Sequence, residues 1–129
     1  MGDIQKMVQT GRQGLGSTGE RLAAEKLVSC GYTILARNFR CRYGEIDLIA
    51  EHRGDLVFVE VKTRRGVANG LPEEAVTVRK QRKIVEVAHY YLSQSCHSEP
   101  AWRVDVVAVQ LSTRGKLEEI RIYEHAFSV

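Results

Sequence analysis

Two short apolar runs separated by a polar break form the most distinctive pattern in the chain. Residues 46–50 and 56–61 are rich in Ile, Val, Leu and Phe, and each run is too short for an ordinary helix. The break between them contains Arg53-Gly54, where glycine can adopt the positive φ that a tight turn needs. The pattern therefore predicts an antiparallel β-hairpin.

The position of the turn sets the register of this hairpin. With Arg53-Gly54 at the centre, Asp47 lies opposite Glu60, and Lys62 follows two residues later on the same face. Facing residues have Cβ atoms about 4.5–5.5 Å apart, so two facing carboxylates can bind one cation. Like charges in such a position destabilise a sheet, and a divalent metal would remove that penalty.

A simpler interpretation of Glu60 and Lys62 has to be weighed against a metal site. Alternation of charged and apolar residues is typical of a strand whose charged face meets solvent. Three features favour a site: Asp47 and Glu60 lie within the most apolar runs of the chain, the hairpin pairs them, and Lys62 follows closely.

A first helix is predicted from Ser17 to Cys30. Apolar residues at helical spacing give it one apolar face, and Gly31 suits the position just beyond its end. Ser17 can cap this helix, with Glu20 three residues later completing a capping box. Glu20 has an alternative role as a third carboxylate beside the hairpin acids, and the helix alone does not decide between the two.

The rest of the chain is predicted to hold three more strands and a second helix. Residues 72–74 mark a helical start, or a turn before a start at Thr77, and helical spacing continues to about Gln94. The order of elements is α-β-β-β-α-β-β, which places the chain in the α/β class with one mixed sheet. The strands outside the hairpin are Tyr32–Asn38, Trp102–Leu111 and Leu117–Tyr123.

Length and composition indicate a single globular domain. The chain has 129 residues, of which 43% are apolar and 27% charged. We expect residues 1–13 to be a flexible arm and residues 14–129 to form the domain. No apolar run approaches about 20 residues and the polar start does not resemble a signal peptide, so no membrane association is expected. Cys30, Cys41 and Cys96 form no C-x-x-C pair, which indicates reduced thiols in a cytoplasmic protein.

The distribution of basic residues bears on the choice of partner. A formal net charge of +3 permits a polyanionic partner without requiring one. Basic residues gather after the hairpin, first in a turn-prone loop over residues 64–71 and then in the first turns of the second helix. Such a run is typical of a solvated face, and its alternative role is to hold phosphates beside the acids. The residues concerned are Arg64, Arg65, Arg79, Lys80, Arg82 and Lys83.

Two other features give less information. Gly14, Gly16 and Gly19 spell G-x-G-x-x-G, but no apolar strand precedes them and no lysine follows Gly16. Nucleotide binding is therefore not predicted, and the glycines are expected to permit a close approach to another segment. Asp105 interrupts an apolar run, and it either pairs with an arginine such as Arg103 or supports the site of the hairpin acids.

The predicted group of side chains suits phosphodiester hydrolysis. Carboxylates without Cys or His select a hard cation, Mg²⁺ or Mn²⁺. A metal in this position lowers the pKa of its bound water and neutralises phosphate oxygens. Lys62 can stabilise a developing oxyanion or orient the attacking water.

Two sequence blocks carry a resemblance to a known family. GEIDLIA (residues 44–50) and VEVKTR (59–64) resemble the bacterial YraN family of predicted endonucleases. That family belongs to the restriction-endonuclease-like PD-(D/E)xK superfamily and is similar to archaeal Holliday junction resolvases. The resemblance covers about residues 14–110, although the proline that often precedes the superfamily's aspartate is absent before Asp47.

The resemblance implies a fold and a set of roles. The expected core is α-β-β-β-α-β, a mixed sheet flanked by helices, with Asp47 and Glu60 as metal ligands and Lys62 as the catalytic lysine. It also implies that Glu20 is the third acid, as in resolvases, rather than a helix cap.

Two functional hypotheses follow from these residues and from the resemblance. The first is a Mg²⁺- or Mn²⁺-dependent endonuclease that acts on nucleic acid, with DNA as the expected substrate, branched junctions among its forms and a two-fold homodimer as the resolvase-like arrangement. The second is a non-catalytic nucleic-acid-binding module with the same fold. The intact set of Asp47, Glu60 and Lys62 favours the enzyme, because a binding module has little reason to keep paired acids facing a polyanion.

Overall fold

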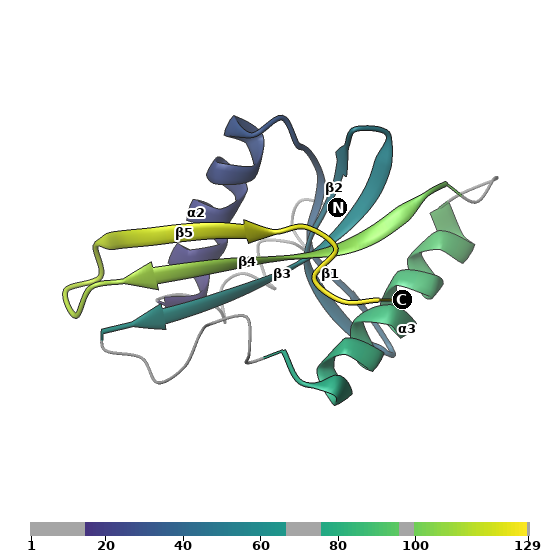
Figure 1. The fold of residues 1–129 in the computed structure, drawn as a ribbon. Helices are drawn as coiled ribbons and strands as arrows, with labels where there is room; N and C mark the ends of the chain where they lie inside the picture. The colour runs from purple at the N-terminus through teal and green to yellow at the C-terminus, as the bar shows by residue number, and fades with distance from the viewer. Residues whose placement is uncertain (1–14, 67–75, 96–99, 129) are drawn as a thin grey trace, which may run out of the picture.

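A five-stranded mixed sheet lies between two helices in the computed structural model, which describes residues 15–66, 76–95 and 100–128 (Figure 1). The strands are arranged in chain order, with β3 and β4 parallel and the other neighbouring pairs antiparallel. This architecture confirms the predicted α/β class and the order α-β-β-β-α-β-β. The elements are α2 (Leu15–Ser29), β1 (Thr33–Cys41), β2 (Gly44–His52), β3 (Asp55–Arg65), α3 (Val78–Ser95), β4 (Trp102–Leu111) and β5 (Leu117–Tyr123).

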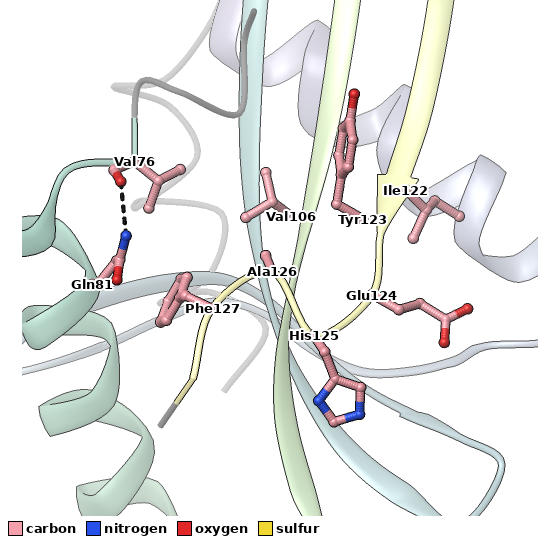
Figure 2. Close-up of a pocket in the computed structure, with 9 residues that line it drawn as sticks. All are labelled: Val76, Gln81, Val106, Ile122, Tyr123, Glu124, His125, Ala126 and Phe127. Atoms are coloured by element: carbon pink, nitrogen blue, oxygen red, sulfur yellow. Dashed lines mark hydrogen bonds between the residues drawn. The ribbon is translucent and has the colours of Figure 1, made fainter.

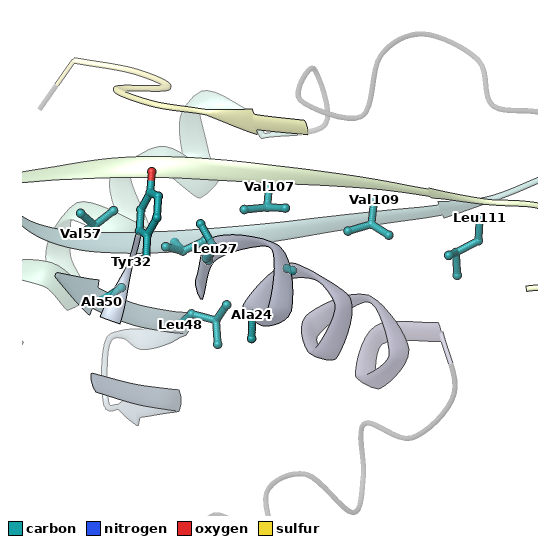
Figure 3. Packing of buried hydrophobic residues seen from close by; sticks show 11 residues of the cluster. Ala24, Leu27, Tyr32, Leu48, Ala50, Val57, Val107, Val109 and Leu111 are labelled. Atoms are coloured by element: carbon teal, nitrogen blue, oxygen red, sulfur yellow. The ribbon is translucent and has the colours of Figure 1, made fainter. Parts of the chain in front are cut away.

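Each helix covers one face of the sheet, and the alternation of side chains along β3 shows how. Val57 and Val59 are fully buried in a cluster with α2 (Figure 3). Phe58, which lies between them, is fully buried in a cluster with α3. We call these two sides the α2 face and the α3 face. Burying a side chain such as Phe58 stabilises the fold by about 1.5–3 kcal/mol, so both helices are held mainly by this apolar packing.

The ends of the helices test the predicted caps. The helix α2 begins at Leu15, so Ser17 and Glu20 lie inside it and the predicted capping box is wrong. Its C-terminal end is as predicted: Gly31 has a φ of +94°, and the Tyr32 N–H donates to the carbonyl of Leu27 at 3.0 Å. For α3, Thr77 caps the first turn by accepting a hydrogen bond from the backbone N–H of Lys80 at 3.1 Å.

The predicted hairpin register is confirmed from the turn as far as the pair Leu48↔Val59. Ladder pairs run from His52↔Asp55 to Leu48↔Val59, and both turn residues have positive φ, 52° at Arg53 and 83° at Gly54. The ladder does not continue to a facing pair of Asp47 and Glu60. Instead, the Asp47 carboxylate accepts a hydrogen bond from the backbone N–H of Val61 at 2.8 Å.

A local irregularity explains why the alternation fails at Asp47. Ile46 packs in the α3-face cluster and Leu48 in the α2-face cluster, although strict alternation would put both on one face. On the neighbouring strand, Asn38 lies between the residues paired with Ile46 and Leu48 and has a φ of 53°. The side-chain alternation of β2 is therefore interrupted beside the irregular backbone of β1 at Asn38. The strand β1 itself continues three residues beyond its predicted end at Asn38.

The last two strands agree with the prediction, whereas two other predicted segments lie partly or wholly outside the described residues. The bounds predicted for β4 and β5 are confirmed. The expected arm at residues 1–13 lies outside the described residues, as do residues 67–71 of the predicted basic loop, whereas Arg64 and Arg65 belong to the end of β3. Within residues 15–66, 76–95 and 100–128, no helix is long and apolar enough to cross a membrane.

Candidate functional site

Two buried acids on β2 and β3 form the centre of the candidate site. Asp47 and Glu60 are each only 5% exposed. Glu60 has the same parity on β3 as Phe58, which places its side chain on the α3 face, and Lys62 follows on that face. The hydrogen bond from Val61 brings the Asp47 carboxylate to the same stretch of β3.

Two lysines approach Glu60 from different elements. The Lys62 ammonium lies 3.5 Å from Glu60 Oε2, and the Lys80 ammonium, from the first turn of α3, lies 3.7 Å from the same oxygen. Thr77 fixes the turn that carries Lys80. We call Asp47, Glu60, Lys62 and Lys80 the acidic centre, of which Lys80 was predicted only as a phosphate contact.

The electrostatics of Glu60 indicate that its charge is poorly compensated. Burial is the main cause that raises the pKa of Glu60 to about 7, and the nearby Asp47 carboxylate raises it further. Lys80 and Lys62 act in the opposite direction but do not cancel these two effects. A divalent cation would stabilise the charged form of both acids and so offset the cost of their burial and repulsion. Their oxygen donors fit Mg²⁺ or Mn²⁺.

Glu20 lies on the helix α2. It is 8% exposed and lies on the same side of α2 as Ala23 and Leu27, which pack on the α2 face. One residue earlier, Gly19 approaches Thr63 so closely that a Cβ atom would overlap the threonine side chain. This contact confirms the close approach expected from the glycines, although Gly19 makes it within a helix.

The contact between Gly19 and Thr63 shows on which side of β3 the helix α2 packs. Thr63 has the opposite parity to Glu60 and Lys62 on β3, so α2 faces the other side of the strand. In the part of the chain that the structure describes, no three Asp, Glu, His or Cys side chains come together closely enough to hold a metal ion. The role of Glu20 as a third ligand therefore stays a prediction.

Beyond Glu60, the α3 face continues across two further strands. Val106 on β4 pairs with Glu60, and Tyr123 on β5 pairs with Val106; in the next row, Ala108 separates Lys62 from Arg121. The short side chains of β4 thus form a floor between the lysine and the residues of β5. Sequence patterns did not indicate Tyr123 or Arg121, because the parallel pairing of β3 with β4 carries no local signal.

A groove of about 460 Å³ lies on this floor (Figure 2). Val106 and Tyr123 line it from the sheet, Val76 and Gln81 from the start of α3, and Phe127 from the C-terminal segment. Figure 2 shows the Gln81 amide bonded to the Val76 carbonyl at the helix side of the groove, a contact of 3.1 Å. The acidic centre therefore has open volume one strand away, in the size range of small-ligand sites.

The predicted basic residues do not all gather in one place. Lys80 faces Glu60, but Arg82 is two residues later, about 200° around the helix, and lines a different hollow with Phe127. Arg79 and Lys83 are exposed on the flank of α3. At the end of β3, Arg65 donates a hydrogen bond from Nε to the Thr113 carbonyl at 3.0 Å. Lys80 and Arg82 therefore lie on different sides of α3, and the phosphate contacts of the six cations stay a prediction.

Asp105 belongs to a separate network on the α2 face, which we call the Arg103 network. Its carboxylate accepts hydrogen bonds from Arg103 Nε at 2.9 Å and from the Tyr32 hydroxyl at 2.6 Å. Arg103 also donates to Asp55 at 2.7 Å, and its Nη2 lies 2.7 Å from His52 Nδ1. The arginine partner, of the two alternatives for Asp105, is confirmed.

Comparison with known proteins places the chain in a group of relatives. The model of "Uncharacterised protein family UPF0102" matches residues 19–109. A UPF0102 protein of Symbiobacterium thermophilum is 50% identical over 113 residues, which cover 88% of this chain and 95% of that protein. UPF0102 proteins of Caldicellulosiruptor saccharolyticus and Clostridium botulinum (strain Hall) are 43% and 42% identical, over 88% and 89% of this chain and 96% and 94% of their own lengths. The matched segment contains Glu20 and the whole acidic centre.

Proposed function

The chain belongs to the uncharacterised protein family UPF0102, and we propose that it is a Mg²⁺- or Mn²⁺-dependent endonuclease that hydrolyses phosphodiester bonds in DNA. The observation that carries the proposal is the buried pair of Asp47 and Glu60 with two lysines at 3.5 and 3.7 Å from Glu60. The resemblance of the same residues to the PD-(D/E)xK superfamily supports this assignment.

The stability cost of the pair supports a functional role. Burial, and secondly the nearby Asp47, raise the pKa of Glu60 to about 7, so keeping this acid charged in the folded protein costs stability. Perturbed pKa values of this kind gather at sites where ligands or reacting groups compensate them. A bound cation is the simplest compensation for two carboxylates.

Each member of the acidic centre has a role in this proposal. Asp47 and Glu60 hold the metal, which supplies a water of lowered pKa and neutralises phosphate oxygens. The Lys62 ammonium stabilises negative charge that develops on the phosphate oxygens. Lys80 holds the Glu60 carboxylate from the helix side and presents positive charge to the same phosphate.

The substrate form and the assembly extend the proposal. The similarity to Holliday junction resolvases favours branched DNA, and a symmetric junction suits a two-fold homodimer with one acidic centre per arm. Free Cys30 and Cys41 agree with action in the reducing cytoplasm.

One observation favours a second candidate function. Within the described residues, the acidic centre lacks a third acid. A protein that binds nucleic acid through the same fold without cutting it needs no complete ligand set. This non-catalytic binding module is therefore the alternative.

A cleavage screen separates the two candidates. Purified protein would be incubated with Mg²⁺ or Mn²⁺ and labelled linear, flapped and four-way DNA, and the products resolved on a denaturing gel. The nuclease predicts metal-dependent products that disappear in Glu60→Gln and Asp47→Ala but persist in Glu51→Gln, a matched control because Glu51 is exposed on β2. Binding without products on every substrate would support the non-catalytic binding module. Products that persist in Glu60→Gln would mean that the cleavage comes from a contaminant and not from the acidic centre.

A further inference from the structure

A second groove lies between the tip of the β1–β2 hairpin and the outer side of α3. Its volume is about 390 Å³, and its lining includes Arg42 and Tyr43 from the hairpin turn and Glu86, His89 and Tyr90 from the helix. None of these residues belongs to the acidic centre. We call it the Tyr43 groove.

Aromatic rings anchor this groove to the core and leave one ring exposed. Tyr43 is 37% exposed, and its ring centroid lies 5.9 Å from that of Tyr90. Tyr90 in turn contacts Phe39 at 6.4 Å, and Phe39 packs edge-on against Tyr91 at 5.2 Å within the α3-face cluster. The groove therefore has a fixed aromatic wall rather than a loose surface side chain.

The hairpin turn itself does not require an aromatic residue. Cys41 pairs with Gly44, so Arg42 and Tyr43 form a two-residue loop, where Asn and Gly are the residues usually found. The Arg42 guanidinium lies over the Tyr43 ring, 5.0 Å from its centre, so a cation and a partly exposed aromatic residue are presented together. This combination is typical of surfaces that stack single-stranded bases.

Basic residues connect the groove with the acidic centre. Arg79, Lys83 and Tyr90 lie four and seven residues apart and so follow one face of α3, with both cations exposed. Along the helix, Tyr90 is ten residues and about 15 Å from Lys80. Along β2, Gly44 is three residues and about 10 Å from Asp47. Spans of this length correspond to a few nucleotides of a DNA strand.

We propose that the Tyr43 groove binds an unpaired nucleobase of the nucleic acid, a few nucleotides from the bond held at the acidic centre. The base stacks on Tyr43 beside the Arg42 guanidinium, while Arg79 and Lys83 hold the intervening phosphates. The Glu86 carboxylate accepts a hydrogen bond from an exocyclic amino group, as carboxylates do from cytosine. The inference rests on the proposed nucleic acid substrate and adds a preference for DNA with unpaired bases.

Equilibrium binding measured by fluorescence anisotropy tests the groove without cleavage. Full-length protein in EDTA would be titrated into a labelled blunt duplex and into the same duplex with a four-nucleotide single-stranded fork. Tyr43→Ala is expected to weaken binding of the forked DNA about five-fold or more and to change blunt-duplex binding less than two-fold. Tyr43→Phe, which keeps the ring, should bind both as the wild type does.

Controls separate the groove from general effects. Leu117→Ala removes another exposed apolar side chain, 46% exposed at the start of β5, and should leave both affinities unchanged. Thermal melting would check the fold of Tyr43→Ala, and Tyr43→Ser, a residue common in turns, provides a second truncation with the same expected result.

The outcomes distinguish this inference from the proposed function. If Tyr43→Ala weakens binding of forked and blunt DNA equally, or weakens neither, base binding in the Tyr43 groove is overturned. DNA binding and cleavage by the wild type would then still support the proposed nuclease. A wild-type protein that binds no DNA of either form overturns both. A Tyr43→Ala variant that changes from dimer to monomer in sedimentation, with unchanged preference for forked DNA, assigns the groove to contact between two copies and overturns base binding.

Discussion

Buried charges occupy both faces of this sheet, in two different arrangements. On the α2 face, Arg103 is 3% exposed and Asp105 fully buried, and the two are joined by two hydrogen bonds with further donors and acceptors around them. In the acidic centre, Asp47 and Glu60 are almost as deeply buried, yet the cations near Glu60 lie 3.5 and 3.7 Å away.

The pKa values show what separates the two clusters. Burial alone lowers the pKa of Arg103, but hydrogen bonds with Asp105, Asp55 and Tyr32 outweigh it and raise that pKa overall. For Glu60, burial and Asp47 together raise the pKa to about 7, toward the neutral acid. The Arg103 network thus stabilises its charges, whereas burial and the neighbouring Asp47 disfavour the charged form of Glu60. A buried acid whose charge is disfavoured in this way is the one expected to bind a cation.

The largest expected effect is on the stability supplied by the Arg103 network. Arg103→Met leaves Asp105 buried without its guanidinium partner and should lower the free energy of unfolding by about 3–5 kcal/mol. Arg121→Met is the matched control, because its ion pair with Glu119 is exposed and screened by solvent, so its loss should cost far less. Urea unfolding measures both variants, and similar losses in the two would refute a special role for the Arg103 network.

Next in size is the effect of Lys62 on turnover. Lys62→Ala should keep metal binding and lose at least tenfold in cleavage rate, about 1.4 kcal/mol of barrier, because the ammonium acts on charge that develops during the reaction. Single-turnover cleavage at saturating Mg²⁺ measures the rate. A rate within a few-fold of the wild type would restrict Lys62 to a structural role.

A smaller effect with the opposite sign to that of Arg103→Met is expected for Glu60 in the absence of metal. Its folded-state pKa of about 7 lies above the unfolded value, so the folded state binds the proton more tightly. The contribution of Glu60 to the stability of the metal-free protein should therefore be complete below about pH 4.5 and be lost as the pH rises from there through about 7. Thermal melts of Glu60→Gln in EDTA should show a flatter pH dependence and, at pH 8, a melting temperature no lower than that of the wild type. A markedly lower one would mean that the charged acid is structural.

The smallest expected effect concerns phosphate contacts beside the acidic centre. Lys80→Gln should flatten the log–log salt dependence of DNA affinity by about 0.9 for one duplex phosphate, equally for all sequences. Arg82→Gln removes the same charge from the opposite side of α3 and should leave the slope unchanged. Equal changes in both variants would show that only net charge matters.

Local patterns in the sequence predicted much of the fold. Alternation and turn chemistry are properties of adjacent residues, so the hairpin register from Leu48↔Val59 and the bounds of β4 and β5 could be derived. The irregularity at Asn38 could not, because its positive φ depends on the neighbouring strand. For the same reason, strict alternation gave a facing Asp47–Glu60 pair that the structure replaces with a side-chain contact to Val61.

The site was predictable only where its residues are close in sequence. Asp47, Glu60 and Lys62 lie in one hairpin, but Lys80 reaches Glu60 from a helix whose packing depends on the whole core. Helical rotation separates Arg82 from Lys80, although both belong to one charge run in the sequence. The Ser17 cap failed because α2 starts two residues earlier, which leaves Glu20 inside the helix.

Thermal melting with added Mn²⁺ tests most directly whether the acidic centre is a metal site. A ligand that binds only the folded state adds about 2.7 kcal/mol to the unfolding free energy at 100 times its Kd. The wild type and Glu51→Gln should therefore show melting temperatures that rise with Mn²⁺ concentration, while Glu60→Gln and Asp47→Ala should show little or no rise. An equal rise in wild type and Glu60→Gln would contradict the account, because the metal would then bind elsewhere.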